Sequence, residues 1–525
     1  MYVIDWLHKQ AMHRPDKVAM VDLASGREIT YRQFDERASR FAEYLVESCK
    51  LVPGERVAVL AHNSSDYLEL LHGCAKAGMI MVCLNWRLPA AELLPILEDA
   101  DPALLVYGSA FAATAESVLS QLPRLPDSRV VVIGVAKGTN GTNALDYETC
   151  LACATGRVIE MPPRGMNDVW HLLYTSGTTG KPKGVIQTYG MVFFNAVNSM
   201  LATQLSCDDV LLNVLPFFHT GGLNLYANPV LHAGGTVYIM QQFDAGATIE
   251  LLERKVTLFL GVPAVYLLMS QHPRFVDAQF QTMRHWSAGG SPMSRNLFDQ
   301  YLAKGVTICF GFGMTETGPT VFICDEATAR AKIGSIGKPV GSMLTRVVRL
   351  DGSAANPNER GELWIKGPGI TPGYWNMPAA TAATIIDGWL HSGDIAYVDE
   401  DGDYYIVDRV KDMYISGAEN VYPAEVENVL YQMPQVADVA VIGVEDEKWG
   451  EAGAAVVVLK PDQTLDAHDV QDFCRTRLSG YKIPKHVAFL SALPRTPAGK
   501  VEKHKLRTQF ANLGQSGSGS GKAPQ

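Results

Sequence analysis

The spacing of apolar residues along the chain alternates between the period of a helix and the unbroken run of a buried strand. Thr30 and Gln33 form a capping-box pair, and apolar residues then recur at helical spacing from residue 34 to residue 45. Residues 56–60 and 79–84 are short apolar runs, which are typical of strands covered on both faces. The first hundred residues therefore predict helices and buried strands in turn.

The same alternation continues through the middle of the chain. Further apolar runs occupy residues 104–106, 130–133, 210–215, 236–240, 257–260 and 306–310. Most of these runs are separated by stretches of helical periodicity. This order predicts an α/β fold in which helices cover the faces of the sheets.

The pattern changes near residue 343. Residues 344–350 and 362–366 predict paired strands joined by a turn-rich segment, and hence a small β unit. Further on, Pro423 suits the first position of a helix, and two more strand-like runs follow it. The expected parts are a large N-terminal domain over residues 1–410 with a small β subdomain at about 343–410, a smaller mobile C-terminal α+β domain over residues 411–514, and a flexible tail over residues 515–525.

Composition restricts the class of protein. The chain has 525 residues, 47% of them apolar, and a net charge of −10, whereas a general nucleic-acid binder needs an excess of Lys and Arg. No signal-peptide core precedes residue 15, and no apolar run is long enough to span a membrane. We therefore expect a cytoplasmic protein without nucleic-acid binding or membrane insertion. The nine cysteines are scattered, and the lone Cys150-x-x-Cys153 spacing is more typical of chance than of a zinc or redox site.

Residues 174–185 carry three glycines, four Ser or Thr hydroxyls and two lysines within twelve positions. Glycine lets backbone N–H groups approach phosphate oxygens, hydroxyls donate from the same arc, and lysine neutralises charge. Lys181 is followed by Pro182, which excludes the P-loop motif and its helix N-terminus. We therefore predict a triphosphate cradle held by a loop. Its residues are Thr175, Ser176, Gly177, Thr178, Thr179, Gly180, Lys181 and Lys183.

Two further segments carry carboxylates that suit a nucleotide. Glu316 follows a glycine-rich run after an apolar strand, where one carboxylate would suit magnesium bound to a triphosphate; otherwise it is a solvated loop residue. Asp394 follows a tight turn and could accept from both hydroxyls of a ribose, or cap the turn instead.

Three more segments carry basic side chains. Residues 408–421 place charges at the expected domain boundary, which predicts a hinge in preference to a solvated linker. Lys500 follows a Pro-x-Gly turn and is either a surface charge or a mobile lysine that enters a phosphate site. His219 lies between aromatic residues and glycines, so it is either a buried hydrogen-bonded histidine or part of a substrate pocket in which the glycines make room.

In this order the segments resemble the adenylate-forming (ANL) superfamily, which includes acyl- and aryl-CoA synthetases, firefly luciferase and the adenylation domains of peptide synthetases. The resemblance extends from about residue 5 to residue 507. It implies the ANL fold and the activity of an AMP-forming carboxylate–CoA ligase that uses ATP, Mg²⁺ and coenzyme A. The expected substrate is a small carboxylic acid, and the expected oligomeric state is a monomer or a homodimer.

The resemblance also implies which residues bind the nucleotide. The side chains that would donate to the β- and γ-phosphates are those of Thr175, Ser176, Thr178 and Thr179. The segments that match the family's adenine and ribose contacts contain Gly289, Gly290, Ser291, Phe312, Gly313, Met314, Asp394 and Arg409. Phe312 stands where the family usually has a tyrosine, so its stacking on adenine should persist without the hydroxyl.

The first chemical step is assigned in the same way. By resemblance Thr315 would contact the α-phosphate, and Glu316 together with Thr175 would bind Mg²⁺. His219 matches a pocket histidine near the substrate carboxylate, and Lys500 matches the lysine of adenylation.

The second step requires the C-terminal domain to rotate, with Lys411 as the hinge. Gly417 would then lie beside the pantetheine of CoA, where a glycine permits close passage. Ala418 departs from the usual Ser-Gly-Gly and leaves that glycine in place.

The acid is the least specified substrate. The expected pocket contains Phe193, Phe194, His219, Thr220, Gly221, Gly222, Met314, Pro319 and Thr320. Two glycines predict room for an apolar monocarboxylic acid, either a cinnamate-type ring or a medium to long alkyl chain. The alternatives are a free-standing adenylation enzyme that loads a carrier protein, a luciferase-type oxygenase, and a nucleotide-binding regulator without catalysis, of which the last is disfavoured by Glu316 and Lys500.

Overall fold

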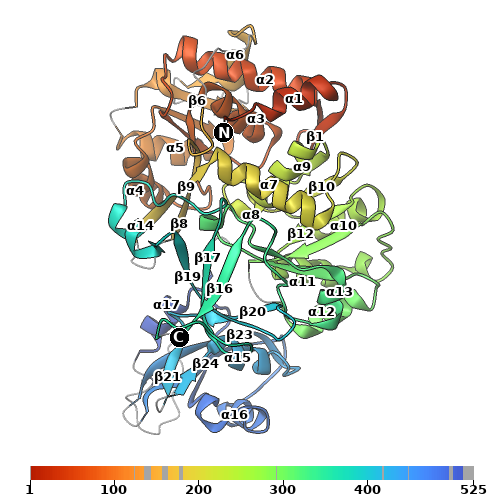
Figure 1. Cartoon of the computed structure of the whole chain (residues 1–525), viewed down its shortest axis with the longest axis vertical. Coiled ribbons are helices and arrows are strands. Elements are labelled where there is room, and N and C mark those ends of the chain that lie inside the picture. Colours follow the sequence, from red (N-terminus) through yellow and green to blue (C-terminus); the bar gives the residue numbers. More distant parts are fainter. Residues whose placement is uncertain are drawn as a thin grey trace. The chain divides into compact units, whose positions relative to one another are not determined.

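The chain forms two compact units in a computed structural model. The model describes residues 2–122, 125–134, 144–156, 164–176, 181–290, 293–349, 351–416, 419–446, 449–495, 500–511 and 513. The first unit contains residues 1–290, 301–345 and 365–390, and the second contains residues 291–300, 346–364 and 391–525. Each unit has sheets and apolar clusters of its own (Figure 1).

A seven-stranded sheet in the first unit has the arms of the predicted phosphate loop at one edge. Its order is β7-β6-β5-β3-β4-β8-β9, and every pairing is parallel except that of β8 with β9. The strands are β3 Arg56–Leu60, β4 Ile80–Cys83, β5 Leu104–Gly108, β6 Val130–Ile133, β7 Leu145–Asp146, β8 Val169–Ser176 and β9 Pro182–Thr188. The strands predicted before residue 134 are thereby confirmed as β3 to β6.

An eight-stranded sheet forms the rest of the first unit's framework. Its order is β15-β14-β13-β12-β10-β11-β1-β2, parallel from β14 to β1 and antiparallel at both ends. The strands are β1 Val18–Asp22, β2 Arg27–Thr30, β10 Val210–Asn213, β11 Thr236–Ile239, β12 Leu258–Gly261, β13 His285–Ala288, β14 Ile308–Phe312 and β15 Phe322–Ile323. The runs predicted between residues 210 and 310 correspond to β10, β11, β12 and β14.

Helices connect these strands and cover both sheets. They are α1 Trp6–His13, α2 Tyr31–Glu43, α3 Ser65–Ala77, α4 Ala90–Ala100, α5 Ala112–Leu119, α6 Tyr147–Ala152, α7 Tyr189–Thr203, α9 Asn228–Ala233, α10 Ala245–Arg254, α11 Pro263–Gln271, α12 Arg295–Leu302, α13 Glu326–Ala331 and α14 Pro378–Thr384. At the start of α2 the Thr30 side chain accepts from Gln33 N at 3.3 Å, and Gln33 Oε1 accepts from Thr30 N at 2.9 Å. The predicted capping box is therefore present.

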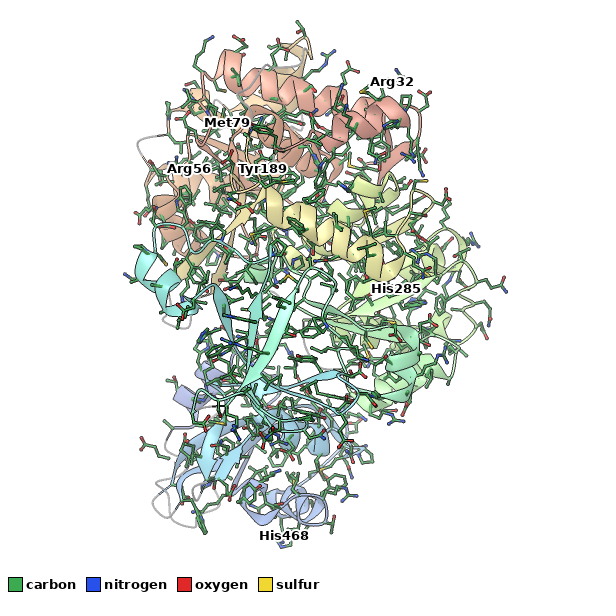
Figure 2. All side chains as sticks on the ribbon, viewed as in Figure 1. Arg32, Arg56, Met79, Tyr189, His285 and His468 are labelled. Atoms are coloured by element: carbon green, nitrogen blue, oxygen red, sulfur yellow. The ribbon has the colours of Figure 1, made fainter. Side chains whose placement is uncertain are left out.

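Alternate residues of β3 face different apolar clusters, as the period of a strand requires. Val57 and Val59 belong to a cluster that includes residues of α2 and α3, whereas Ala58 and Leu60 pack with residues of α4. The first cluster also contains residues of β10 and β11, so α2 and α3 pack between the two sheets. Figure 2 shows how densely side chains fill this unit around Met79. The expected α/β class is confirmed.

A five-stranded sheet follows near the predicted small β unit. Its order is β16-β17-β19-β18, with β20 also paired to β19. The strands are β16 Leu344–Val348, β17 Gly361–Lys366, β18 Ile385–Ile386, β19 Trp389–Val398 and β20 Tyr404–Arg409. The division between the two compact units passes through β16, β17 and β19.

The C-terminal part of the second unit is an α+β assembly. Its sheet has the order β22-β21-β24-β23, with β25 paired to β24. The elements are β21 Tyr414–Ser416, β22 Glu419–Val421, α15 Pro423–Leu430, β23 Val436–Asp446, β24 Gly450–Leu459, α16 Ala467–Arg475, β25 His486–Phe489 and α17 Lys503–Gln509. Pro423 is the first residue of α15, as its sequence position predicts. The expected border between a large N-terminal domain and a mobile C-terminal domain at residue 410 remains a prediction. The role of Lys411 as the hinge between them also remains a prediction.

In the described part of the chain no helix combines the length and the apolar composition needed to cross a membrane.

The capping box gives a direct test of the fold at α2. Thr30→Ala leaves Gln33 N without its side-chain acceptor, and we expect a loss of about 1 kcal/mol in the free energy of unfolding, seen as a lower melting temperature in calorimetry. Thr30→Ser keeps the hydroxyl and serves as the control. Equal melting temperatures for the alanine and serine variants would contradict a stabilising cap.

Candidate active site

The predicted phosphate loop is the tip of an antiparallel hairpin. Strands β8 and β9 pair with Thr175 opposite Lys183 and with Ser176 opposite Pro182. A hairpin therefore presents this loop, and the absence of a helix N-terminus agrees with the Lys181-Pro182 sequence. The loop residues Gly177, Thr178, Thr179 and Gly180 lie outside the described residues, as does the side chain of Ser176.

A short turn, η6 Thr315–Thr317, follows strand β14 and contains the predicted α-phosphate and Mg²⁺ contacts. Thr315 and Glu316 are both buried. The Thr317 hydroxyl accepts from Met314 N at 3.0 Å and donates to the carbonyl of Pro319 at 2.9 Å. A Cβ on Gly313 would lie 1.5 Å from that same carbonyl oxygen, so only glycine fits there. The turn is thus closely braced by its own residues.

Glu316 is held by a segment that returns from the region of β17. Its Oε1 accepts a hydrogen bond of 2.9 Å from the Tyr374 hydroxyl, and its backbone carbonyl accepts from Thr371 N at 2.8 Å. Burial and the nearby Glu316 carboxylate raise the pKa of Tyr374, so the phenol remains a donor at neutral pH.

The donor set suits a nucleotide-bound magnesium ion. In the described chain no group of three His, Cys, Asp or Glu side chains forms an all-protein metal cage. Magnesium in nucleotide sites uses one or two protein carboxylates, and phosphate oxygens and water complete its coordination. The single buried carboxylate of Glu316 fits that requirement, and a bound Mg²⁺ would be held there.

A buried amide network attaches this turn to β9 and to the histidine segment. Gln187 Nε2 donates to the Thr315 carbonyl at 2.8 Å, and Asn195 Oδ1 accepts from Thr320 N at 3.2 Å. Asn224 joins the two because it donates to Gln187 Oε1 at 3.5 Å and its carbonyl accepts from Asn195 Nδ2. All three amide side chains are buried. The network therefore clamps the segment from Thr315 to Thr320 at both ends.

His171 completes this network at the base of the hairpin. Burial lowers its pKa to about 3, so the ring is neutral, and Asn224 Nδ2 lies 3.1 Å from Nε2. Because the amide nitrogen can only donate, Nε2 accepts. A charged histidine would disrupt the network, and burial prevents that.

The histidine segment corrects one expectation about the acid pocket. His219 is the N-cap of the short helix α8 Thr220–Gly222, and its Nδ1 accepts from Gly221 N at 3.1 Å. A Cβ on Gly222 would lie 2.3 Å from the Pro216 carbonyl and 2.5 Å from that of Leu215. The sequence analysis expected Gly222 to make room for a ligand. The structure shows instead that the missing side chain of Gly222 allows close backbone packing.

The expected adenine segments end neighbouring strands of the eight-stranded sheet. Gly289 and Gly290 follow β13, and Phe312 ends the adjacent parallel strand β14. A Cβ on Gly289 would lie 3.4 Å from the Gly311 carbonyl, so the two segments are in contact. The Phe312 ring packs edge-on against the Phe322 ring, with 6.1 Å between the ring centroids. The carboxyl ends of parallel strands are where open α/β sheets bind ligands. Ser291 lies outside the described residues.

The second unit brings Asp394 and Arg409 together. They are opposite each other on β19 and β20, with Arg409 Nε 3.2 Å from Asp394 Oδ1. Asp394 is buried, and Glu362 Oε1 accepts at 3.0 Å from the backbone N of Gly393, the residue before Asp394 in β19. The expected ribose pair is thus an adjacent carboxylate and guanidinium.

The two predicted catalytic lysines lie on segments of the second unit. Lys500 is exposed and lies next to Val501, which forms an antiparallel bridge with Arg495. Partial desolvation and the neighbouring charge of Arg409 lower the pKa of Lys411. Gly417 lies outside the described residues.

Two residues that the sequence did not point to contact the site, namely Gln187 and Tyr374. Gln187 is a fully buried polar residue directly after the apolar pair Val185 and Ile186, which is a detectable signal because a buried amide requires partners. Tyr374 follows a glycine-rich run, and its partner Glu316 is 58 positions away. Only the fold brings those two together.

Comparisons with known proteins identify the family of the chain. Residues 7–375 match the AMP-binding enzyme family, and residues 425–500 match the AMP-binding enzyme C-terminal domain. The chain belongs to this family, within the adenylate-forming superfamily that its motifs resemble. Its enzyme class is accordingly that of the AMP-forming acyl-CoA synthetases.

Several relatives match almost end to end. The feruloyl-CoA synthase of an Amycolatopsis species is 39% identical over 96% of this chain and 98% of its own. The indoleacetate–CoA ligase of Aromatoleum aromaticum is 37% identical and the long-chain-fatty-acid–CoA ligase FadD13 of Mycobacterium tuberculosis 36% identical, each over 97% of this chain and 98% of its own. The structure of ATP-bound MatB from Rhodopseudomonas palustris superposes with a TM-score of 0.88 at 30% identity, covering 97% of this chain and 99% of that one.

The amide network predicts an effect on nucleotide binding. Gln187→Met removes the donor to the Thr315 carbonyl at nearly constant volume, and we expect ATP affinity measured by calorimetry to fall about five- to tenfold. Gln471→Met removes a comparable amide, which donates to the Pro484 carbonyl at 3.1 Å in the second unit, and should bind ATP as the wild type does. Equal affinities for the two variants would contradict the proposed clamp.

Proposed function

We propose that the protein is a carboxylate–CoA ligase that forms an acyl-CoA through an acyl-adenylate. The substrate carboxylate attacks the α-phosphorus of ATP and expels pyrophosphate; the CoA thiol then attacks the acyl carbon and expels AMP. The observation that carries this proposal is that the buried Thr315–Thr317 turn is attached to the lysine-bearing hairpin. This attachment would place Thr315, the expected α-phosphate contact, near the lysines that hold the departing pyrophosphate.

In the first step the hairpin holds the end of ATP that departs. Lys181 and Lys183 supply positive charge beside the β- and γ-phosphates, and Thr315 orients the α-phosphate. Glu316 holds Mg²⁺, which supplies charge neutralisation to the phosphates when it is bound. Lys500 stabilises the charge that develops on the α-phosphate as the C-terminal domain presents it. Asp394 and Arg409 bind the ribose and so fix the nucleotide.

The second step depends on a change in the C-terminal domain. Rotation about Lys411 withdraws Lys500 and brings Gly417 to the path of the thiol. Both arrangements are needed because Lys500 must lie at the α-phosphate during adenylation, whereas the thiol needs access to the acyl carbon in the second step. The use of one domain in two arrangements explains why a lysine needed for the first step is exposed.

For the acid we propose an apolar monocarboxylate, with a cinnamate-type aromatic ring first and a medium or long alkyl chain second. Two relatives that support the ring are named for feruloyl and indoleacetate substrates, and one that supports the alkyl chain is named for long-chain fatty acids. Phe194 packs against Phe193, whose ring also packs against Trp6 at 5.7 Å. Phe193 is therefore engaged in packing, and Phe194 is the better candidate to contact the acid.

The proposal predicts acid-dependent pyrophosphate release. A panel of aryl acrylates, indole-type acids, fatty acids and amino acids would be assayed with ATP, with and without CoA. We expect the highest kcat/KM for an apolar monocarboxylate, with acyl-CoA formed when CoA is present. Release that never depends on an added acid would contradict the ligase, and an adenylate that accumulates regardless of CoA would indicate a carrier-protein acceptor.

Lys500 gives a test that separates the two steps. Lys500→Ala should lower adenylation by at least about a hundredfold, since it removes a charge from the reacting phosphate. Thioester formation from supplied acyl-adenylate should stay within about twofold of the wild type. Lys505→Ala removes an exposed lysine paired with Glu502 and serves as the control. An equal loss of both steps in Lys500→Ala would contradict the two-arrangement scheme.

A further inference from the structure

The segment 371–375 lies between the Glu316 turn and strand β9 and contacts both. Thr371 N donates to the Glu316 carbonyl at 2.8 Å, and the Thr371 hydroxyl donates to the Ile186 carbonyl at 2.7 Å. Trp375 N donates to the Gly184 carbonyl at 2.7 Å, and Tyr374 forms a bridge with Val185. The segment therefore extends the hairpin sheet and fixes the turn against it.

The side chain of Tyr374 continues this bracing to two charged groups. Its hydroxyl donates to Glu316 Oε1 at 2.9 Å, and Lys183 Nζ lies 4.8 Å from the centre of its ring. An ammonium within about 6 Å of an aromatic ring is attracted by its face, and a hydrogen bond to a carboxylate is stronger than one between neutral groups. Tyr374 is only 8% exposed, so both contacts are made largely out of water.

This arrangement solves a specific electrostatic problem. A carboxylate and a lysine placed together in a partly buried site attract each other, and a direct Lys183–Glu316 ion pair would neutralise both. The phenol occupies one oxygen of Glu316 at its hydroxyl end, while the ring face takes Lys183. The two charges are thereby held at different parts of one rigid ring, and each stays available to the nucleotide.

We propose that Tyr374 is a positioning residue that keeps Glu316 oriented toward the metal ion of the nucleotide and Lys183 oriented toward its β- and γ-phosphates. The proposal rests on the proposed function for the identity of the nucleotide. Tyr374 acts through its contacts with Glu316 and Lys183, and the proposal gives it no contact with the reacting carboxylate or the α-phosphate. Its effect is therefore expected on metal-assisted ATP binding and adenylation, and not on the attack of the thiol.

Two substitutions separate the contacts of Tyr374. Tyr374→Phe keeps the ring beneath Lys183 and removes only the hydroxyl that holds Glu316. Tyr374→Leu removes both contacts. Tyr31→Phe is the matched control, because it also removes a buried hydroxyl, which donates to the Gly235 carbonyl at 2.7 Å and touches none of the site residues.

The measurement is ATP binding by calorimetry, with excess Mg²⁺ and with EDTA. The wild type and Tyr31→Phe should gain affinity when Mg²⁺ is present. In Tyr374→Phe we expect that gain to shrink about tenfold, with the EDTA affinity unchanged, because only the metal ligand loses its orientation. In Tyr374→Leu we expect the ATP affinity measured in EDTA to fall about threefold as well, since Lys183 loses its contact with the ring. Thioester formation from supplied acyl-adenylate should remain at the wild-type rate in Tyr374→Phe.

The outcomes distinguish this proposal from the proposed function. A Tyr374→Phe variant with the full Mg²⁺-dependent gain would overturn the positioning role. An equal loss of ATP affinity in EDTA, of ATP affinity in Mg²⁺ and of thioester formation would also overturn it, because that pattern indicates a structural role. If the wild type releases no pyrophosphate with any acid while Tyr374→Phe still loses the Mg²⁺-dependent gain, the ligase proposal fails and the positioning role stands.

Discussion

Strand β9 holds the turn Thr315–Thr317 through buried hydrogen bonds, and the geometry of the phosphate site depends on that attachment. Gln187 ties the Thr315 carbonyl to the strand at 2.8 Å, and the segment at Thr371 ties Glu316 to the same strand. The hairpin lysines and the Glu316 carboxylate therefore keep fixed positions relative to each other. In the proposed function this attachment orients the α-phosphorus of ATP relative to the groups that hold its β- and γ-phosphates.

The hydrogen-bond network that makes this attachment is polar and buried. The loss of one of its side chains would therefore leave the partners of that side chain without a hydrogen bond. Unpaired amides away from water are costly, so Gln187, Asn195 and Asn224 must satisfy one another. Asn224 lies in the π-helix η4 Leu223–Ala227, directly after the His219 segment. π-helical turns often occur at functional sites. The same residues thus connect the segment expected near the acid with the segment expected near the α-phosphate, and this connection explains why a chain would retain so many amides in its core.

Much of this could be predicted from local sequence, and the rest could not for a physical reason. Strands such as β3 and the Thr30 capping box depend on neighbours in the chain, so their patterns are readable. A loop without a helix N-terminus was predicted because Lys181-Pro182 excludes a helix start, whereas the pairing of β8 with β9 was seen only in the structure. Tyr374 was missed because its partner is distant in sequence and the contact exists only after folding. Gly222 was misinterpreted as ligand space because whether a missing side chain faces a ligand or a carbonyl depends on tertiary packing.

The central claim is that the carboxylate oxygen of the acid attacks the α-phosphorus of ATP. The most direct measurement uses the acid labelled with ¹⁸O at both carboxylate oxygens, and mass spectrometry of the products after turnover with ATP and CoA. Attack at the α-phosphorus followed by thiol attack on the acyl carbon predicts AMP that carries one ¹⁸O and pyrophosphate that carries none. Label found in inorganic phosphate or pyrophosphate, with unlabelled AMP or ADP, would contradict the account.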